Sequence, residues 1–536
     1  MNCPTRTGHA TMLASKDYRH FQVLDPKGAV IHEFEGAEKA GHALPGDSVA
    51  VIDEGGGSVR LLVRAEKRTL VGILNLTSKY VYGMTQRGIP MYECQPMNRG
   101  YPSFRIACKE RDRSRNLLVS FQFDSWDPGS ELPRAGIIEI LGPCEDFAAE
   151  KRALAMLAQP YPAPMCDITL DTSEIRYIIE KDELTFNIDP EGCKDIDDVI
   201  TLKVLDSYVG WRIWITIADV AETVLPDTKT YSYAAQAAST AYQDGAAVRP
   251  MLHRGLSESA LSLLPGQERM GLALRADFYG GTLHNPVFQN VVVTNRESYT
   301  YESIYKSTTV PIAILRAIAN SLAGRQVTDS HEWIEQLMLY YNKEAAKILV
   351  AAGNGILRRH DAPFEERRAA VMAVDPTLEF LAMRSAEYCS VNDAAGHWGL
   401  GTGLYCHASS PIRRFADLIN QRVIKAHIHG KRIEEDFGPL ILQLNQRQRE
   451  IISADRDYQF LKAIEDAESS QVLAKILDGR SAWVDDWKTL VRFESNFAPG
   501  SIVRLRYFCD RRKVAWKERI LFEEVPLPSV DVVDLS

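Results

Sequence analysis

Four aspartates fall within ten residues in the stretch Ile188-Asp189-Pro190-Glu191-Gly192-Cys193-Lys194-Asp195-Ile196-Asp197-Asp198. Carboxylates this close together repel each other unless they are solvated or bound to a cation. The apolar run Leu184–Ile188 predicts a strand that ends at this cluster. Hard cations such as Mg²⁺ take oxygen ligands and keep water in the remaining positions. The stretch is therefore a candidate metal site at a strand end, and a solvated acidic loop is the alternative.

A calcium-binding EF-hand loop does not explain the cluster. That loop needs a glycine at its sixth position and a glutamate at its twelfth. Counted from Asp189 these positions hold Lys194 and Ile200, and counted from Asp195 they hold Ile200 and Asp206. A site that processes phosphate groups is the remaining option, provided that a basic phosphate-binding element lies elsewhere in the chain.

Such a basic element occupies residues 407–418, with the sequence H-A-S-S-P-I-R-R-F-A-D-L. Ser409 and Ser410 can cap a helix whose first position is the proline that follows them. Free N–H groups at a helix start attract phosphate, and Arg413 and Arg414 would add bidentate donors. We expect a helix that begins just after the proline, runs to Gly430 and binds phosphate at its start. An ordinary helix with surface arginines is the alternative.

Together these two segments resemble the ribonuclease II family, which includes ribonuclease R and the Dis3 enzymes. The family's acidic motif, I-D-P-x-x-x-x-D-x-D-D, matches at every specified position. Its second motif, H-F-T-S-P-I-R-R-Y-x-D-L, matches with mild departures at Ala408, Ser409 and Phe415. Further family segments follow in the same order over about residues 130–465, namely Ile217–Val220, Leu252–Leu264, Arg359–Pro363 and Gly396–Leu400.

The resemblance implies a metal-dependent enzyme that hydrolyses single-stranded RNA processively from the 3′ end to nucleoside 5′-monophosphates. The cofactor would be Mg²⁺, with Mn²⁺ as an alternative. The implied metal ligands are Asp189, Asp195, Asp197 and Asp198. The implied catalytic groups are Asp197 and Asp198 together with Arg413 and Arg414, whose charge would offset that of the phosphate. The individual roles of the aspartates stay open, although we expect Asp197 to matter most for the rate.

The resemblance also implies the residues that bind RNA. Tyr242 would stack on the terminal base, and Tyr301 and Glu335 would lie near the ribose. The phosphate would contact Ser410, Arg413 and Arg414. For each tyrosine the alternative is an ordinary packed side chain, and Glu335 is a weaker match because the family's second glutamate is replaced by Gln336.

The expected fold is a multidomain α+β protein in which an RNB-type catalytic domain is flanked by small OB-like β-barrels. Short strands in residues 1–160 predict two barrels of the cold-shock type. Residues 161–468 would form the catalytic domain, with helices over His331–Ala352 and Pro439–Glu468. Residues 469–536 would form a small C-terminal OB-like barrel. Prolines at 160, 162 and 164 predict a linker between the first two parts.

Composition narrows the class of protein. Of the 536 residues, 45% are hydrophobic and 25% are charged, which excludes a largely disordered or collagen-like chain. The formal net charge of −9 argues against a uniformly basic RNA coat, but not against a local basic channel. No apolar stretch reaches the roughly 18 residues that span a bilayer, so we expect no membrane partner. No apolar region typical of a secretion signal is present near Met1.

The nine cysteines are scattered without a C-x-x-C pair, so neither a disulfide framework nor structural zinc is expected. This pattern favours a reducing intracellular compartment, the cytoplasm by default. A single-chain channel would suit a monomer, and protein partners stay unknown. The main alternative function is a non-catalytic RNA-binding or scaffold protein on the same fold. We expect such a protein to lose at least one metal aspartate, whereas this chain keeps all four.

Overall fold

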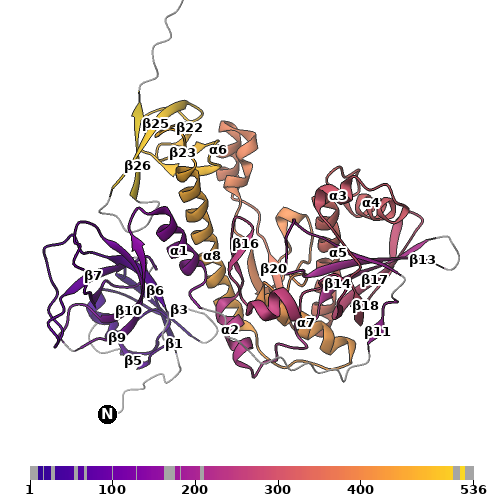
Figure 1. Cartoon of the computed structure of the whole chain (residues 1–536), viewed down its shortest axis with the longest axis horizontal. Coiled ribbons are helices and arrows are strands. Elements are labelled where there is room, and N and C mark those ends of the chain that lie inside the picture. Colours follow the sequence, from indigo (N-terminus) through magenta and orange to yellow (C-terminus); the bar gives the residue numbers. More distant parts are fainter. Residues whose placement is uncertain are drawn as a thin grey trace, which may run out of the picture. The chain divides into compact units, whose positions relative to one another are not determined.

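The computed structural model describes residues 10–15, 17–25, 30–52, 58–65, 69–98, 100–127, 129–161, 176–180, 183–205, 210–510 and 519–525. The chain forms two compact units. Unit 1 comprises Met1–Pro160, Pro363–Met383 and Glu450–Ser536, and unit 2 comprises Tyr161–Ala362 and Arg384–Arg449. Figure 1 colours the chain along its sequence. The predicted domain boundaries at residues 160 and 468 stay a prediction, and the predicted linker falls largely outside the described residues.

Unit 1 begins with a five-stranded antiparallel sheet in the order β3-β2-β1-β4-β5. The strands alternate buried and exposed positions, as expected for a sheet that covers a core on one face. The core contains Met12, Phe21 and Val49. The elements are β1 (Ala10–Ala14), β2 (His20–Leu24), β3 (Val30–Glu35), the short helix η1 (Ala37–Ala40), β4 (Ser48–Ile52) and β5 (Ser58–Val63).

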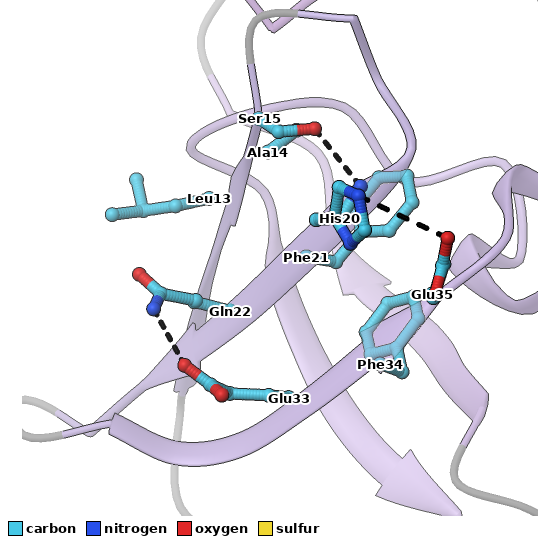
Figure 2. Close-up of a pocket in the computed structure, with 9 residues that line it drawn as sticks. All are labelled: Leu13, Ala14, Ser15, His20, Phe21, Gln22, Glu33, Phe34 and Glu35. Carbon is cyan, nitrogen blue, oxygen red and sulfur yellow. Dashed lines mark hydrogen bonds and ion pairs between the residues drawn. The ribbon is translucent and has the colours of Figure 1, made fainter.

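A cavity of about 550 Å³ lies against β1, β2 and β3 (Figure 2). On its rim Gln22 donates to Glu33, and the His20 ring lies 3.8 Å from the Glu35 carboxylate. The two carboxylates on the rim would repel the phosphate groups of an RNA.

The second sheet of unit 1 is a closed barrel in the order β10-β8-β7-β6-β9. The pairing of β10 with β8 is parallel, whereas its pairing with β9 is antiparallel. Helix α1 (Phe147–Ala158) follows, and the carboxylate of its N-cap Asp146 accepts from the Ala149 N–H. The strands are β6 (Leu70–Leu74), β7 (Met91–Pro96), β8 (Phe104–Ala107), β9 (Leu117–Ser125) and β10 (Arg134–Pro143).

The last sheet of unit 1 has five antiparallel strands in the order β24-β23-β22-β25-β26. It shares a core with Leu154 of α1 and with Tyr458 and Leu461 of α8 (Gly438–Glu465), a helix that continues from unit 2. The remaining elements are α6 (Glu365–Val374), η3 (Pro376–Ala382), β22 (Gln471–Asp478), β23 (Ser481–Val484), β24 (Thr489–Arg492), β25 (Ile502–Cys509) and β26 (Ile520–Val525).

Unit 2 is built on a seven-stranded sheet in the order β11-β18-β17-β14-β13-β12-β19. Its central strands are nearly continuous apolar runs because both faces are covered. Phe186, Trp214 and Trp333 lie in this core. The strands are β11 (Tyr177–Ile178), β12 (Leu184–Ile188), β13 (Asp198–Val204), β14 (Trp211–Ala218), β17 (Glu268–Tyr279), β18 (Thr282–Thr294) and β19 (Glu297–Tyr299).

Helices and two small two-stranded sheets complete unit 2. The predicted helix over 331–352 is confirmed as α5, and Gly353 ends it with a φ of 69° that favours glycine. The elements are α2 (Lys229–Ala237), β15 (Ala241–Gln243), β16 (Ala246–Arg249), η2 (Leu256–Ala260), α3 (Tyr301–Tyr305), α4 (Val310–Ala323), α5 (Ser330–Ala352), β20 (Ile356–Arg359), β21 (Glu387–Ser390), η4 (Val391–Asp393), η5 (Trp398–Leu400) and α7 (Phe415–Ile428). Among the described residues, we find no helix long and apolar enough to cross a membrane.

Candidate active site

The acidic segment, defined as residues 189–198, joins the antiparallel strands β12 and β13 of unit 2. Asp189 follows the last residue of β12, and its N–H donates to the Tyr299 carbonyl at 3.1 Å. Asp198 is the first residue of β13. Gly192 has a φ of 80° in the turn between them, a conformation that glycine adopts without strain. The predicted strand before Asp189 is confirmed as β12, and its antiparallel pairing with β13 brings both ends of the segment together.

Asp197 is the most buried aspartate of the segment, with 4% of its surface exposed. Its carboxylate accepts from the Ile412 N–H at 3.0 Å and from Nε of Arg413 at 3.1 Å. Burial raises the pKa of Asp197 to about 7, and the charge of Arg413 and the Ile412 N–H oppose this rise. The acidic segment therefore meets the basic element, whose residues lie more than 200 positions later in the sequence.

Negative charge is poorly compensated in the rest of the acidic segment. Burial raises the pKa of Asp189, although the Asn187 amide donates to it at 2.9 Å. Burial also raises the pKa of Asp198 well above its usual value, and the charges of Asp189 and Asp197 add to the rise. A cation placed between Asp189 and Asp198 would reverse both effects.

The donor set fits a small hard cation. Mg²⁺ is commonly held by one or two carboxylates together with substrate phosphates and water. Asp189 and Asp198 supply the two carboxylates. No group of three or more His, Cys, Asp or Glu side chains is arranged to hold a metal within the described ranges. The chain's own ligands therefore suit an ion that completes its shell with phosphate oxygens and water.

The basic segment, defined as residues 407–418, differs from the prediction. Helix α7 begins at Phe415, its N-cap is Arg414, and no side chain caps it. The N–H groups of Arg413 and Arg414 donate to the Ser410 carbonyl in a turn. The Ile412 N–H donates to Asp197, and the Ser410 N–H donates to Asp417 at 2.8 Å. The predicted serine cap is wrong, because no side chain caps α7, and the N–H groups of Ser410 and Ile412 donate to carboxylates of the protein. Phosphate binding by this segment stays a prediction.

The two arginines of this segment have different surroundings. Nε of Arg413 binds Asp197, and its Nη2 donates to the Ser410 hydroxyl at 3.2 Å, yet 46% of its side chain is exposed. Arg414 forms a bidentate pair with Asp417, at 3.0 Å and 2.7 Å. The Asp417 side chain is fully buried. Arg413 can therefore reach a phosphate, whereas Arg414 is engaged inside the protein.

Sequence reasoning missed two residues that hold the basic segment in place. Asp417 binds both Ser410 and Arg414, and its spacing of three from Arg414 was the available signal. Asn342 of α5 accepts from the Ala408 N–H at 2.9 Å and donates to the Ser409 hydroxyl at 3.2 Å. No local pattern marks Asn342, because its partners lie more than 60 residues away.

The three residues predicted to bind the base and ribose lie on separate elements. Tyr242 on β15 donates its hydroxyl proton to Asp195 at 2.6 Å. Tyr301 at the start of α3 stacks on His331, with ring centroids 3.8 Å apart. Burial and the charges of Asp189 and Asp198 raise the pKa of Tyr301 to about 12. Glu335 is exposed on α5, one helical turn beyond His331 and on the same face.

Comparison with known proteins places this site in context. The family model of the RNB domain matches residues 180–313 and 371–430, and that of the Dis3-like cold-shock domain 2 matches residues 92–158. The exosome complex exonuclease dis3 of Schizosaccharomyces pombe is 24% identical over 442 residues, which are 64% of this chain and 45% of that protein. The chain spans about half the length of the curated relatives it matches.

Two solved structures share the fold over nearly the whole chain. Mycoplasma genitalium RNase R, in complex with ribose-methylated single-stranded RNA, has a TM-score of 0.70 and 16% identity, and the match covers 96% of this chain and 100% of that chain. Yeast Ssd1, described as a pseudonuclease, has a TM-score of 0.67 and 15% identity, and the match covers 93% of this chain and 81% of that chain. The fold is therefore common to a ribonuclease and to a protein described as a pseudonuclease. The residues of the site, and not the fold, decide the function.

Proposed function

Because this chain belongs to the RNB-domain ribonuclease family, we propose that it is an exoribonuclease that hydrolyses single-stranded RNA processively from the 3′ end to nucleoside 5′-monophosphates. The observation that carries the proposal is the meeting of Asp197 with Arg413 beside Asp189 and Asp198. Carboxylates and an accessible guanidinium at one place are what hydrolysis of a phosphodiester needs.

The residues have distinct roles in this proposal. Asp189 and Asp198, with Asp195 beside them, would hold Mg²⁺ or Mn²⁺, which would lower the pKa of a bound water and offset the charge of the phosphate. Arg413 binds the phosphate through donors that do not contact Asp197. Asp197 keeps this guanidinium in place and supplies charge beside the reacting group. Arg414 supports the segment through Asp417 rather than by touching the substrate.

The RNA end lies against aromatic side chains in the same proposal. The ring of Tyr242 stacks on the terminal base, a contact that every base can make. Tyr301 and Glu335 lie toward the ribose, where contact with the 2′-hydroxyl distinguishes RNA from DNA. Replacing the terminal ribose with a deoxyribose tests this part, and cleavage at an unchanged rate contradicts it.

The central experiment uses the purified chain with a 5′-labelled single-stranded RNA, in Mg²⁺ or in EDTA, resolved on a sequencing gel. We expect Mg²⁺-dependent shortening from the 3′ end to a product of a few nucleotides, with release of mononucleotides. A labelled RNA that stays intact in Mg²⁺ contradicts the proposal. The Asp197→Asn variant is the control for a contaminating nuclease.

The similarity to Ssd1 favours a second candidate, a non-catalytic RNA-binding or scaffold protein. In this alternative, the pair between Arg413 and Asp197 is a permanent structural link. RNA binding by fluorescence anisotropy without cleavage, in Mg²⁺ and in Mn²⁺, would support it over the enzyme.

A further inference from the structure

The Tyr242 hydroxyl contacts a carboxylate of the acidic segment directly. It lies 2.6 Å from Oδ2 of Asp195, a length typical of a charge-assisted hydrogen bond. A tyrosine hydroxyl carries its proton at neutral pH and an ionised carboxylate can only accept, so the hydroxyl is the donor. Base stacking needs only the ring, so the sequence-based role of Tyr242 leaves the hydroxyl unexplained.

The strand that carries Tyr242 is fixed to the basic segment by main-chain hydrogen bonds. The Thr240 N–H donates to the Arg413 carbonyl at 3.0 Å, and the Phe415 N–H donates to the Ala238 carbonyl at 2.9 Å. A register shift between Ala241 and Tyr242 interrupts the pairing of β15 with β16. Irregularities of this kind re-aim a side chain. The Tyr242 hydroxyl is thus held on the same scaffold as Arg413.

Asp195 lies close enough to Asp189 for their charges to repel each other, and among the described residues few groups orient its carboxylate. It lies in an irregular stretch of the segment, three residues after the turn at Gly192. Its other oxygen, Oδ1, lies 3.7 Å from the Cys193 thiol, a weak donor. Of these two donors to the carboxylate, the hydroxyl of Tyr242 is therefore the stronger, and it leaves lone pairs on both oxygens for other partners.

We propose that Tyr242 is a positioning residue whose hydroxyl fixes the orientation of Asp195 at the cation site, separately from any stacking by its ring. The inference rests on the cation site of the proposed function. Groups that orient a metal ligand through a hydrogen bond typically change metal affinity or activity by about 10- to 100-fold when they are removed.

The test compares Tyr242→Phe, which removes only the hydroxyl, with Tyr242→Ala, which also removes the ring. Free Mn²⁺ is measured by electron paramagnetic resonance, and single-turnover cleavage and final product length are measured on labelled RNA. We expect Tyr242→Phe to weaken Mn²⁺ binding about tenfold or more and to keep the product length. Tyr242→Ala should weaken Mn²⁺ binding similarly and also change the product length.

A double-mutant cycle shows whether the hydroxyl acts through Asp195. In an Asp195→Ala background, Tyr242→Phe should cause no further loss of Mn²⁺ affinity. The matched control is Tyr231→Phe, which removes a half-buried hydroxyl of the same unit that accepts from Arg422 at 2.7 Å. We expect this control to bind Mn²⁺ as the parent chain does.

The outcomes separate the inference from the proposed function. Parent-like Mn²⁺ affinity in Tyr242→Phe, or an equal loss in the Asp195→Ala background, would overturn the inference. Tyr242-dependent Mn²⁺ binding without RNA cleavage would support the inference and contradict the exoribonuclease. A parent chain that binds no Mn²⁺ would overturn the inference together with the cation site.

Discussion

The acidic and basic segments face each other in the site, but they differ in how completely their polar groups are paired. In the basic segment, the N–H groups of Ser410 and Ile412 have carboxylate partners, and Arg414 is held at two points by Asp417. In the acidic segment, burial raises the pKa of both Asp189 and Asp198, the charges of neighbouring aspartates add to the rise, and Arg413 offsets only part of it.

This difference indicates that one segment supports the structure and the other is prepared to bind a ligand. Buried polar groups with full hydrogen bonding rigidify a structure, whereas like charges that lack a counter-charge destabilise it until a ligand arrives. We infer that the basic segment is built to hold its shape without substrate and that the acidic segment gains stability from a cation. Variants in either segment test this difference.

The largest effect is expected for Asp197→Asn, which removes the charge at the junction of the two segments. We expect the single-turnover cleavage rate to fall about 10³-fold, because a charged group beside the reacting phosphate is lost while the shape is kept. Rapid-quench cleavage of labelled RNA measures the rate. Fluorescence anisotropy should show nearly unchanged RNA affinity, and full activity would show that Asp197 is not part of the active site.

Asp417→Asn should lower the stability of the fold rather than act directly on the cleavage step. Removing one partner of a buried ion pair leaves Arg414 without its counter-charge, which costs about 3 kcal/mol. Thermal unfolding followed by circular dichroism should show a lower Tm. The double variant Asp417→Asn/Arg414→Met should recover part of the loss, because the unpaired buried charge is gone. An unchanged Tm in the single variant would mean that the basic segment does not depend on this pair.

Arg413→Met should lower kcat about 10²-fold with a smaller change in Tm than Arg414→Met causes. The reason is that 46% of the Arg413 side chain is exposed, against 27% of the Arg414 side chain, which is paired with the buried Asp417. Steady-state kinetics and thermal unfolding of the two variants provide the measurement. An equal loss of kcat in Arg413→Met and Arg414→Met would contradict the different roles proposed for the two arginines.

The smallest effect is expected for Asp198→Asn, which should raise the Tm of the metal-free chain by a few degrees. The folded-state pKa of Asp198 lies above its unfolded value, so the stability of the metal-free parent falls as pH rises from about 4 through the folded pKa. The variant avoids this loss of stability, so the difference in Tm between the variant and the parent should be larger at pH 8 than at pH 5.

Added Mg²⁺ provides the check on this last prediction. It should stabilise the parent more than Asp198→Asn and so reduce the difference between them. Glu191→Gln is the matched control, because it removes an exposed carboxylate from the same segment. A higher Tm in this control as well would point to a general charge effect rather than to the buried site.

Much of the fold follows from local pattern in the sequence. The short strands predicted within residues 1–160 are found, among them β4 and β9, and the predicted helices over 331–352 and 439–468 correspond to α5 and α8. These elements are recognisable because apolar periodicity and end signals act over a few residues. The helix expected just after Pro411 starts three residues late, at Phe415. The N–H groups of Ser410 and Ile412 instead donate to Asp417 and Asp197.

The sequence by itself determined which chemical groups the site contains: four aspartates on one side and two adjacent arginines on the other, in an order that identifies the family. Only the tertiary structure decided how these groups pair. It directs Arg413 to Asp197, Arg414 to Asp417 and the Tyr242 hydroxyl to Asp195. The physical reason is the separation along the chain over which each kind of information acts. Residue type and local periodicity are properties of neighbouring positions, whereas the partner of a charged or polar side chain depends on distances between segments that only folding brings together.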